Sequence, residues 1–168
     1  MGARITRAGT LRIVVEGVAK LHGARHTVLP DRIETGTYAM AVAMTGGDVQ
    51  LSGARPELLQ SALDVLAQAG ADITVNNDGI RVIRNGAGLR PVTVSTAPFP
   101  GFPTDLQAQL MALMACAGGS SQITETIFEN RFMHVQELAR FGARISLDGE
   151  TATIDGTAPS PHFATHCR

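Results

Sequence analysis

The sequence changes abruptly from an extended to a helical pattern at residues 97–109, which read APFPGFPTDLQAQ. Three prolines and a glycine among the first seven of these residues disfavour a helix there. Thr104 and Gln107 then have the T-x-x-Q spacing of a capping box, in which both side chains bond to free backbone N–H groups at a helix start. This spacing predicts a helix from Asp105 to about residue 117, with the Asp105 carboxylate at the positive end of the helix dipole.

Asp105 has two interpretations at this point. Acidic residues in a first turn commonly do no more than stabilise their own helix. Alternatively, the carboxylate faces a ligand that binds in front of the helix. The positive end of the dipole stabilises a carboxylate and thereby weakens it as a base. In either case the position favours the ionised form of Asp105.

The chain repeats itself with an offset of 72 residues. A Gly-Ala-x-Ile motif, which we call the glycine mark, stands at residues 70–73 and again at residues 142–145, and a third copy lies at residues 2–5. Gly46-Gly47 likewise returns as Gly118-Gly119. A glycine after a helical pattern is typical of a helix C-cap, and a hairpin pattern follows each mark. The repeat predicts an α/β fold of two units, each a strand, a helix, a strand, a helix and a hairpin.

The predicted elements follow this order along the chain. A hairpin pairs residues 5–6 with 11–15. The first unit has a strand at 26–29, a helix at 32–44 capped by Asp31, a strand at 48–51, a helix from Pro56, and a hairpin of 73–75 and 80–83. The second has a strand at 91–96, a helix at 105–117, a strand at 122–126, a helix from Asn130, and a hairpin of 145–147 and 151–154. We therefore divide the chain into residues 1–29 (opening hairpin and strand), 30–156 (two repeats) and 157–168, a segment without periodicity that we expect to be disordered.

Composition excludes several classes of function. The 168 residues carry 14 basic and 15 acidic side chains, so the net charge is −1, and no basic tract indicates a nucleic-acid or anionic-membrane partner. No apolar run is long enough to span a bilayer. The two cysteines, Cys116 and Cys167, are too few for a disulfide framework. We expect a soluble cytoplasmic protein.

Two long motifs carry a family resemblance. FPTDLQAQ at residues 102–109 and TETIFENRFMHVQEL at residues 124–138 resemble the bacterial UDP-N-acetylglucosamine 1-carboxyvinyltransferases, the enolpyruvyl transferases that begin peptidoglycan synthesis. The resemblance implies an inside-out α/β barrel with helices inside and sheets outside. It covers two of the three units of the C-terminal domain and the hairpin before them, roughly the middle two-fifths of the family's length. Residues 157–168 depart from the family pattern.

The resemblance implies a reaction and two site residues. The family moves the enolpyruvyl group of phosphoenolpyruvate to the 3-hydroxyl of UDP-N-acetylglucosamine, without a cofactor. The aspartate that matches Asp105 binds the sugar nucleotide and is the proposed base, and the residue that matches Ile127 also contacts the sugar nucleotide. This chemistry needs a base, an acid for the methylene carbon, and cations around the phosphate.

Arg131 and Phe128 are further candidates for substrate binding. Arg131 could reach the cleft between domains, or it could form an ion pair with Glu129 or Glu125 that only fixes the turn. Phe128 could line the substrate pocket or belong to the core. His134 is expected to pack or cap.

Other reactive residue types give weaker signals. Cys116 lies in the helical pattern of residues 105–117, so we interpret it as a small core residue; the family's reactive cysteine lies in the other domain. His162, His166 and Cys167 have metal-ligand spacing but no partner ligands nearby in sequence, so we expect no metal site.

Alternatives to the enolpyruvyl transfer remain. The chain could instead be related to the 5-enolpyruvylshikimate-3-phosphate synthases, or it could be a non-catalytic remnant or protein-interaction fragment. Because the acid and most phosphate ligands are missing, we expect the chain to be inactive alone unless an N-terminal domain complements it. A missing third unit should leave helix faces such as Leu106, Leu110 and Leu113 partly uncovered, which predicts marginal stability or self-association.

Overall fold

The repeat seen in the sequence is also a structural repeat. The computed structural model describes residues 1–86 and 88–157. In the first unit the strands β3, β4 and β5 span Gly47–Ser52, Asp72–Asn76 and Gly79–Arg84. In the second unit β7, β8 and β9 span Gly119–Thr124, Arg144–Asp148 and Thr151–Gly156, which are the same bounds 72 residues later.

The first unit is a three-stranded antiparallel sheet with two helices. Its strand order is β3-β5-β4. Helix α1 spans Arg32–Thr45, a 3-10 turn η1 spans Pro56–Leu58, and α2 spans Gln60–Ala69. As predicted, Asp31 caps α1: its Oδ1 accepts from the backbone N–H groups of Ile33 at 2.7 Å and Glu34 at 3.3 Å. Gly70 ends α2 at φ +107°, a left-handed conformation in which glycine avoids the Cβ clash.

The second unit has one strand more. Its strand order is β6-β7-β9-β8, and β6 (Thr93–Ser95) pairs with β7 in parallel while the other pairs are antiparallel. A 3-10 turn η2 (Thr104–Leu106) leads into α3 (Gln107–Ala115). Helix α4 spans His134–Arg140, so the predicted start near Asn130 is wrong. Asn130 has φ +56°, which is incompatible with a right-handed helix, and residues 125–133 form a loop instead.

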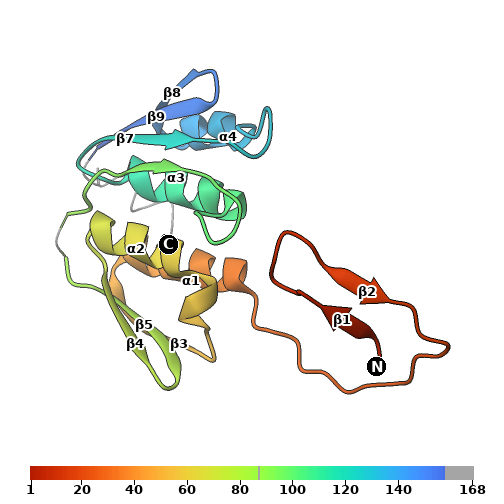
Figure 1. Cartoon of the computed structure of the whole chain (residues 1–168). Helices are drawn as coiled ribbons and strands as arrows, with labels where there is room; N and C mark the ends of the chain where they lie inside the picture. The colour runs from red at the N-terminus through yellow and green to blue at the C-terminus, as the bar shows by residue number, and fades with distance from the viewer. Residues whose placement is uncertain (87, 158–168) are drawn as a thin grey trace.

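The two sheets lie on the outside and the helices α1, α2 and α3 lie between them (Figure 1). Helices α1 and α3 meet at equivalent positions, since the Gln109 side-chain amide donates to the Thr37 hydroxyl at 3.0 Å. Gly36 of α1 leaves the space that Leu106 fills. The core is built mainly from alanine, the aliphatic residues and methionine.

The expectation of partly uncovered leucines on α3 is wrong. Leu106, Leu110 and Leu113 are each 0% exposed. The reason is that α3 packs against α1 on one side and against its own sheet, at β9, on the other. These leucines therefore contribute to the core that joins the two units.

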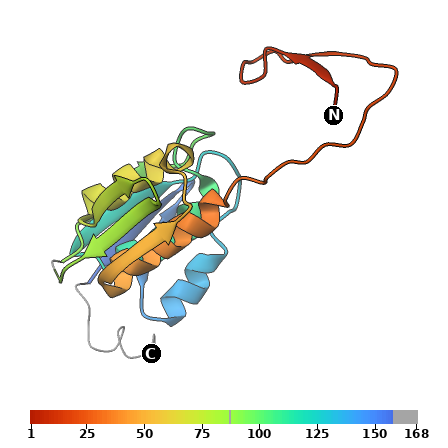
Figure 2. The same ribbon diagram turned by 90° about the horizontal axis from the view of Figure 1, so that it is seen from below.

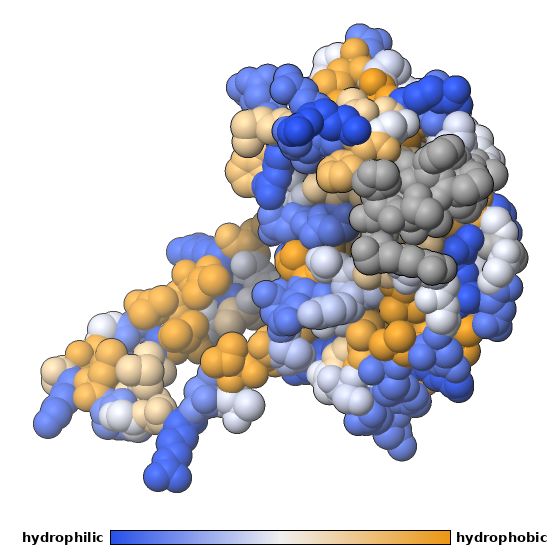
Figure 3. Space-filling model, turned by 180° about the vertical axis from the view of Figure 1, so that it is seen from behind, coloured by the Kyte–Doolittle hydropathy of each residue, from blue (hydrophilic) through white to orange (hydrophobic). Residues whose placement is uncertain are grey.

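The opening hairpin is confirmed, whereas the strand expected after it is not. Strands β1 (Arg4–Thr6) and β2 (Val14–Glu16) pair antiparallel and extend away from the two units (Figures 1 and 2). Residues 26–29 form no strand, because they lie in the exposed arm that runs away from the two units (Figures 1 and 2) and so do not pair with the edge of β3, the equivalent of β7. Apolar side chains are exposed along this arm, as the space-filling view shows (Figure 3): Ile5, Leu11, Ile13, Val15, Leu21, Val28 and Leu29.

Candidate functional site

The second unit gathers its polar side chains where β6 and β7 end. Because the two strands are parallel, their carboxyl ends meet at one edge of the sheet. Thr96 follows β6 and donates its backbone N–H to the Thr124 carbonyl at 2.9 Å, while the backbone N–H of Thr126 donates to the Thr96 hydroxyl at 2.8 Å. Turn η2, which carries Asp105, and the loop 125–133 are thereby placed beside each other.

Asp105 and Arg131 are in direct contact at this edge. The Arg131 guanidinium donates from Nη2 to Asp105 Oδ1 at 2.6 Å. The side chains of Arg131 and Asp105 remain 37% and 51% exposed, so a ligand can reach both charged groups. Arg131 thus pairs with neither Glu129 nor Glu125, the two partners considered from sequence. Its contact links Asp105, which the family resemblance assigns to the site, to Arg131, which was a further candidate for substrate binding.

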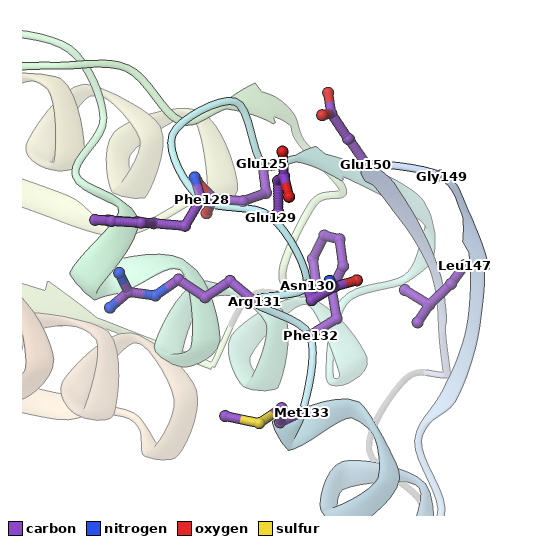
Figure 4. A pocket seen from close by; sticks show the side chains of 10 residues that line it. All are labelled: Glu125, Phe128, Glu129, Asn130, Arg131, Phe132, Met133, Leu147, Gly149 and Glu150. Carbon is purple, nitrogen blue, oxygen red and sulfur yellow. The ribbon is translucent and has the colours of Figure 1, made fainter.

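Phe128 belongs to the surface of the site and not to the core. Its side chain is 53% exposed, and the Arg131 guanidinium lies over its ring with Cζ 4.9 Å from the centroid. The two side chains extend in the same direction from the loop, while Phe132 and Leu147 lie on the other side (Figure 4). The ring and the guanidinium form a cation–π pair that keeps Arg131 close to the Asp105 carboxylate.

Two depressions flank this group of residues. A smaller one of about 150 Å³ is lined by Asp105, Ile127, Arg32 and the loop 97–103. A larger one of about 530 Å³ lies between the loop 125–133 and the turn of the β8–β9 hairpin (Figure 4). Asp105 and Ile127, the two residues assigned from the resemblance, therefore line the same depression.

A buried carboxylate lies directly behind these residues. Glu125 is 2% exposed and follows the last residue of β7. Its Oε1 accepts from the Thr96 hydroxyl at 2.9 Å and from the backbone N–H groups of Ile127 at 2.9 Å and Phe128 at 3.2 Å. These bonds fix the first turn of the loop 125–133.

The other oxygen of Glu125 binds the residues predicted to form a capping box, and that prediction is wrong. The Thr104 hydroxyl donates to Glu125 Oε2 at 2.6 Å and the Gln107 amide donates to it at 3.3 Å. Neither side chain caps the helix: Pro103 is the N-cap residue of η2, and no side chain caps α3. A buried carboxylate requires hydrogen-bond donors, and Thr104 and Gln107 supply two of those that Glu125 binds.

The hydrogen bonds determine the charge of this carboxyl group. Burial raises the pKa of Glu125, but the donors Thr104, Ile127, Thr96 and Phe128 together outweigh burial and hold the pKa below its ordinary value. Glu125 is therefore ionised at neutral pH. The pKa of nearby His134 is also lowered, mainly by burial and to a smaller extent by the positive charge of Arg131.

Four candidate residues named from the sequence lie together at this edge, and other residues of the edge were not named as candidates. Asp105, Ile127, Phe128 and Arg131 come together as the motifs imply. Glu125 was considered only as an ion-pair partner, and Arg32, which lines the smaller depression, was not considered. The signal for Glu125 is strand periodicity: it is in phase with Ser121 and Ile123, which are both 0% exposed. A charged residue in phase with a buried face needs bonding partners.

The remaining candidate residues lie away from this edge. Cys116 is 8% exposed and follows α3, in agreement with its interpretation as a small core residue. His162, His166 and Cys167, like most of the segment 157–168, lie outside the described residues. Within the described ranges, no group of three His, Cys, Asp or Glu side chains could hold a metal ion. None of the helices in these ranges combines the length and apolar composition of a membrane span.

Comparison with known proteins gives one consistent family. The sequence model of the family "EPSP synthase (3-phosphoshikimate 1-carboxyvinyltransferase)" matches residues 1–165. The chain is 85% identical to the UDP-N-acetylglucosamine 1-carboxyvinyltransferase of Rhodopseudomonas palustris strain BisB18 and 83% identical to that of Afipia carboxidovorans. Each alignment covers 100% of this chain and 40% of the relative, so the chain spans about two-fifths of the length of these relatives.

Solved structures show the same fold. The enolpyruvyl transferase NikO from Streptomyces tendae is 29% identical with a TM-score of 0.74, over 92% of this chain and 37% of that one. EPSP synthase from Acinetobacter baumannii has a TM-score of 0.69 over 95% of this chain and 39% of that one; at 23% identity it supports the fold alone. The predicted α/β fold of repeated enolpyruvyl-transferase units is confirmed.

Proposed function

The chain belongs to the EPSP synthase family, and from this premise we propose that it forms the sugar-nucleotide side of an enolpyruvyl transferase that acts on UDP-N-acetylglucosamine. The observation that carries the proposal is the contact between Asp105 and Arg131 at a depression that Ile127 also lines. Relatives that are 82–86% identical and are named UDP-N-acetylglucosamine 1-carboxyvinyltransferase support this substrate over shikimate 3-phosphate.

In the proposed reaction, the 3-hydroxyl of the sugar attacks carbon 2 of phosphoenolpyruvate. A C–O bond forms, the hydroxyl loses its proton, and the methylene carbon gains a proton from an acid. Loss of phosphate and of a methyl proton from the tetrahedral intermediate then restores the double bond. Asp105 lies at the depression with its carboxylate half exposed, so it can accept the hydrogen bond of the hydroxyl and take its proton.

Arg131 serves this step through Asp105. Its hydrogen bond at 2.6 Å fixes one carboxylate oxygen and leaves the other free to face the sugar hydroxyl. When phosphoenolpyruvate binds, the same guanidinium can turn toward its phosphate, because arginine pairs well with either anion. The ring of Phe128 packs against the guanidinium, and Ile127 contacts the sugar nucleotide.

We propose that this chain does not complete the reaction by itself. The acid and most cations that the chemistry needs would come from a complementing N-terminal domain, on the same polypeptide or another. The reaction would belong to peptidoglycan synthesis, and hence to cell-wall growth and division in the cytoplasm. No metal or cofactor enters the proposed steps, and self-association remains a prediction.

The test is calorimetric titration of this chain with UDP-N-acetylglucosamine, with shikimate 3-phosphate titrated in parallel. We expect saturable binding of the sugar nucleotide alone, weakened at least about tenfold in Asp105→Asn, since a lost hydrogen bond to a charged group costs about 1.5–3 kcal/mol. Asp72→Asn, an exposed position in β4, is the matched control and should bind like the wild type. Binding of shikimate 3-phosphate would favour the synthase alternative. A folded chain that binds neither would favour the non-catalytic remnant.

A further inference from the structure

We propose that Glu125 is a positioning residue that sets the separation between Asp105 and Ile127, and thereby the affinity for the sugar nucleotide. The choice of UDP-N-acetylglucosamine as the ligand rests on the proposed function. The coupling of Asp105 to Ile127 through Glu125 rests on the geometry alone. Each oxygen of the carboxylate binds a different wall of the smaller depression. Oε2 binds Thr104, the residue before Asp105, while Oε1 binds the backbone N–H of Ile127.

The bonds leave the carboxylate little freedom. Five donors at 2.6–3.3 Å surround it, from the end of β6, from turn η2, from α3 and from the loop 125–133. Its side chain is almost completely buried, so these donors are not exchanged for water. A shift of η2 is therefore transmitted through Glu125 to the loop that carries Ile127, Phe128 and Arg131.

Stability of the fold alone does not explain why a buried carboxylate stands at position 125. The equivalent residue of the first unit is Gly53, and that unit pairs β3, β5 and β4, the equivalents of β7, β9 and β8, without a buried carboxylate. Burial of a charge is costly, and well-packed apolar residues often stabilise an interior at least as well as a buried charged group does. The bonds of Glu125 go to the residues around Asp105 and Ile127, so the carboxylate acts where a ligand is proposed to bind.

Substitutions can separate the hydrogen bonds of Glu125 from its charge. In Glu125→Gln the amide oxygen can take the place of Oε1. The amide N–H₂ can donate to the Thr104 hydroxyl once that hydroxyl rotates, and to the Gln107 amide oxygen once that amide flips. Glu125→Ala removes all five bonds. Thr104→Val removes only the bond on the side of Asp105. Thr151→Val is the matched control, because the Thr151 hydroxyl is also part-buried but pairs with Thr124 at 3.0 Å, outside the network.

The experiment combines two readouts on the whole chain. Calorimetry with UDP-N-acetylglucosamine should give affinity at least about tenfold weaker in Glu125→Ala, within about threefold of wild type in Glu125→Gln, and unchanged in Thr151→Val. Amide NMR without ligand should show that Thr104→Val displaces the resonances of Ile127 and Phe128 on the far side of the carboxylate. A residue that only stabilises its own loop would not transmit this change.

The outcomes separate the two proposals. If the wild type binds no sugar nucleotide, the proposed function fails, and the NMR comparison still decides whether Glu125 couples the two walls. If the wild type binds and Thr104→Val moves neither the far-side resonances nor the affinity, the positioning role is wrong. If Glu125→Ala does not fold, Thr104→Val and Glu125→Gln decide the question, and loss of binding in Glu125→Gln would overturn the proposal as well.

Discussion

The two units share a scaffold and differ where a site is needed. Strands β3, β4 and β5 match β7, β8 and β9 residue for residue at an offset of 72. After β3 the chain reaches η1 within four residues, through Gly53 at φ +74°. After β7 it continues through a nine-residue loop, which begins at Glu125, before α4. The segment from β7 to β8 is as long as the segment from β3 to β4, but where the first unit forms η1 the second unit forms this loop, which carries Ile127, Phe128 and Arg131.

The helix starts differ in the same way. Helix α1 begins directly after Asp31, a capping residue. Helix α3 follows η2, where Thr104 and Asp105 stand at the places of Arg32 and Ile33. The first unit thus uses these positions for its own helix, whereas the second directs Thr104 to Glu125 and Asp105 to Arg131. Departures from a repeat therefore locate a site better than the conserved pattern of the repeat does.

The largest effect should come from the core that joins the units. Leu110 of α3 is 0% exposed, whereas Tyr38, its equivalent in α1, is 58% exposed. We expect Leu110→Ala to lower the free energy of unfolding by about 2–5 kcal/mol, because it leaves a cavity in a packed interior. Tyr38→Ala should lower the free energy of unfolding by well under half as much as Leu110→Ala does. Urea unfolding measures both, and equal losses would contradict the asymmetry between the two helices.

The next effect concerns Arg131. Arg131→Ala should weaken binding of UDP-N-acetylglucosamine about tenfold, because Asp105 loses the donor that orients it. The free energy of unfolding should change by less than about 1 kcal/mol, since exposed ion pairs contribute little. Arg140→Ala, which breaks the exposed pair with Glu137, is the control for both measurements. Wild-type affinity in Arg131→Ala would mean that the contact with Asp105 has no role in binding.

A smaller effect concerns pH. The folded state holds the pKa of Glu125 below the ordinary value of 4.5, so the unfolded chain takes up this proton first as the pH falls. The stabilisation from Glu125 is thus complete above about pH 6 and is lost as the pH falls through the ordinary value to the lowered one. Thermal unfolding of wild type and Glu125→Gln between neutral and acidic pH measures it. The difference in melting temperature between the wild type and Glu125→Gln should shrink as the pH falls. A difference that stays constant would contradict an ionised Glu125 in the folded state.

The smallest effect is expected at an ion pair of the first unit. Arg81 of β5 donates to Asp48 of β3 at 2.8 Å and lowers the pKa of that carboxyl group. The second unit has Thr153 and Ser120 at these places. Asp48→Asn should leave the affinity for the sugar nucleotide unchanged and the melting temperature nearly so, because both side chains are about half exposed. A clear loss of binding would place part of the site on the sheet of the first unit.

Much of the fold follows from the sequence because local signals agree with it. The glycine marks, the Asp31 cap and the hairpin turns each have a short-range physical cause, and the 72-residue offset extends the assignment from one unit to the other. The strand expected at residues 26–29 was wrong because a strand needs a partner, which no local pattern supplies. The start of α4 was missed because Asn130 adopts a left-handed conformation that its neighbours do not require.

The site could be predicted only in part. The motifs identified Asp105, Ile127, Phe128 and Arg131, but not which of them touch. Thr104 and Gln107 have the spacing of a capping box, yet both bond to Glu125. That partner lies 21 residues from Thr104 in sequence, so it can be found only after β7 and η2 are placed beside each other. Strand periodicity was the one local sign that Glu125 is buried.

The most direct test of this account is a map of UDP-N-acetylglucosamine binding by amide NMR on the whole chain. We predict saturable shifts at residues 104–106 and 125–131 of the second unit, and no shifts at the equivalent residues 53–59 of the first. Such a result would place the sugar nucleotide where the second unit departs from the repeat. Equal shifts in both units, or no shifts in a chain whose spectrum is that of a folded protein, would contradict the claim that this edge is a binding site.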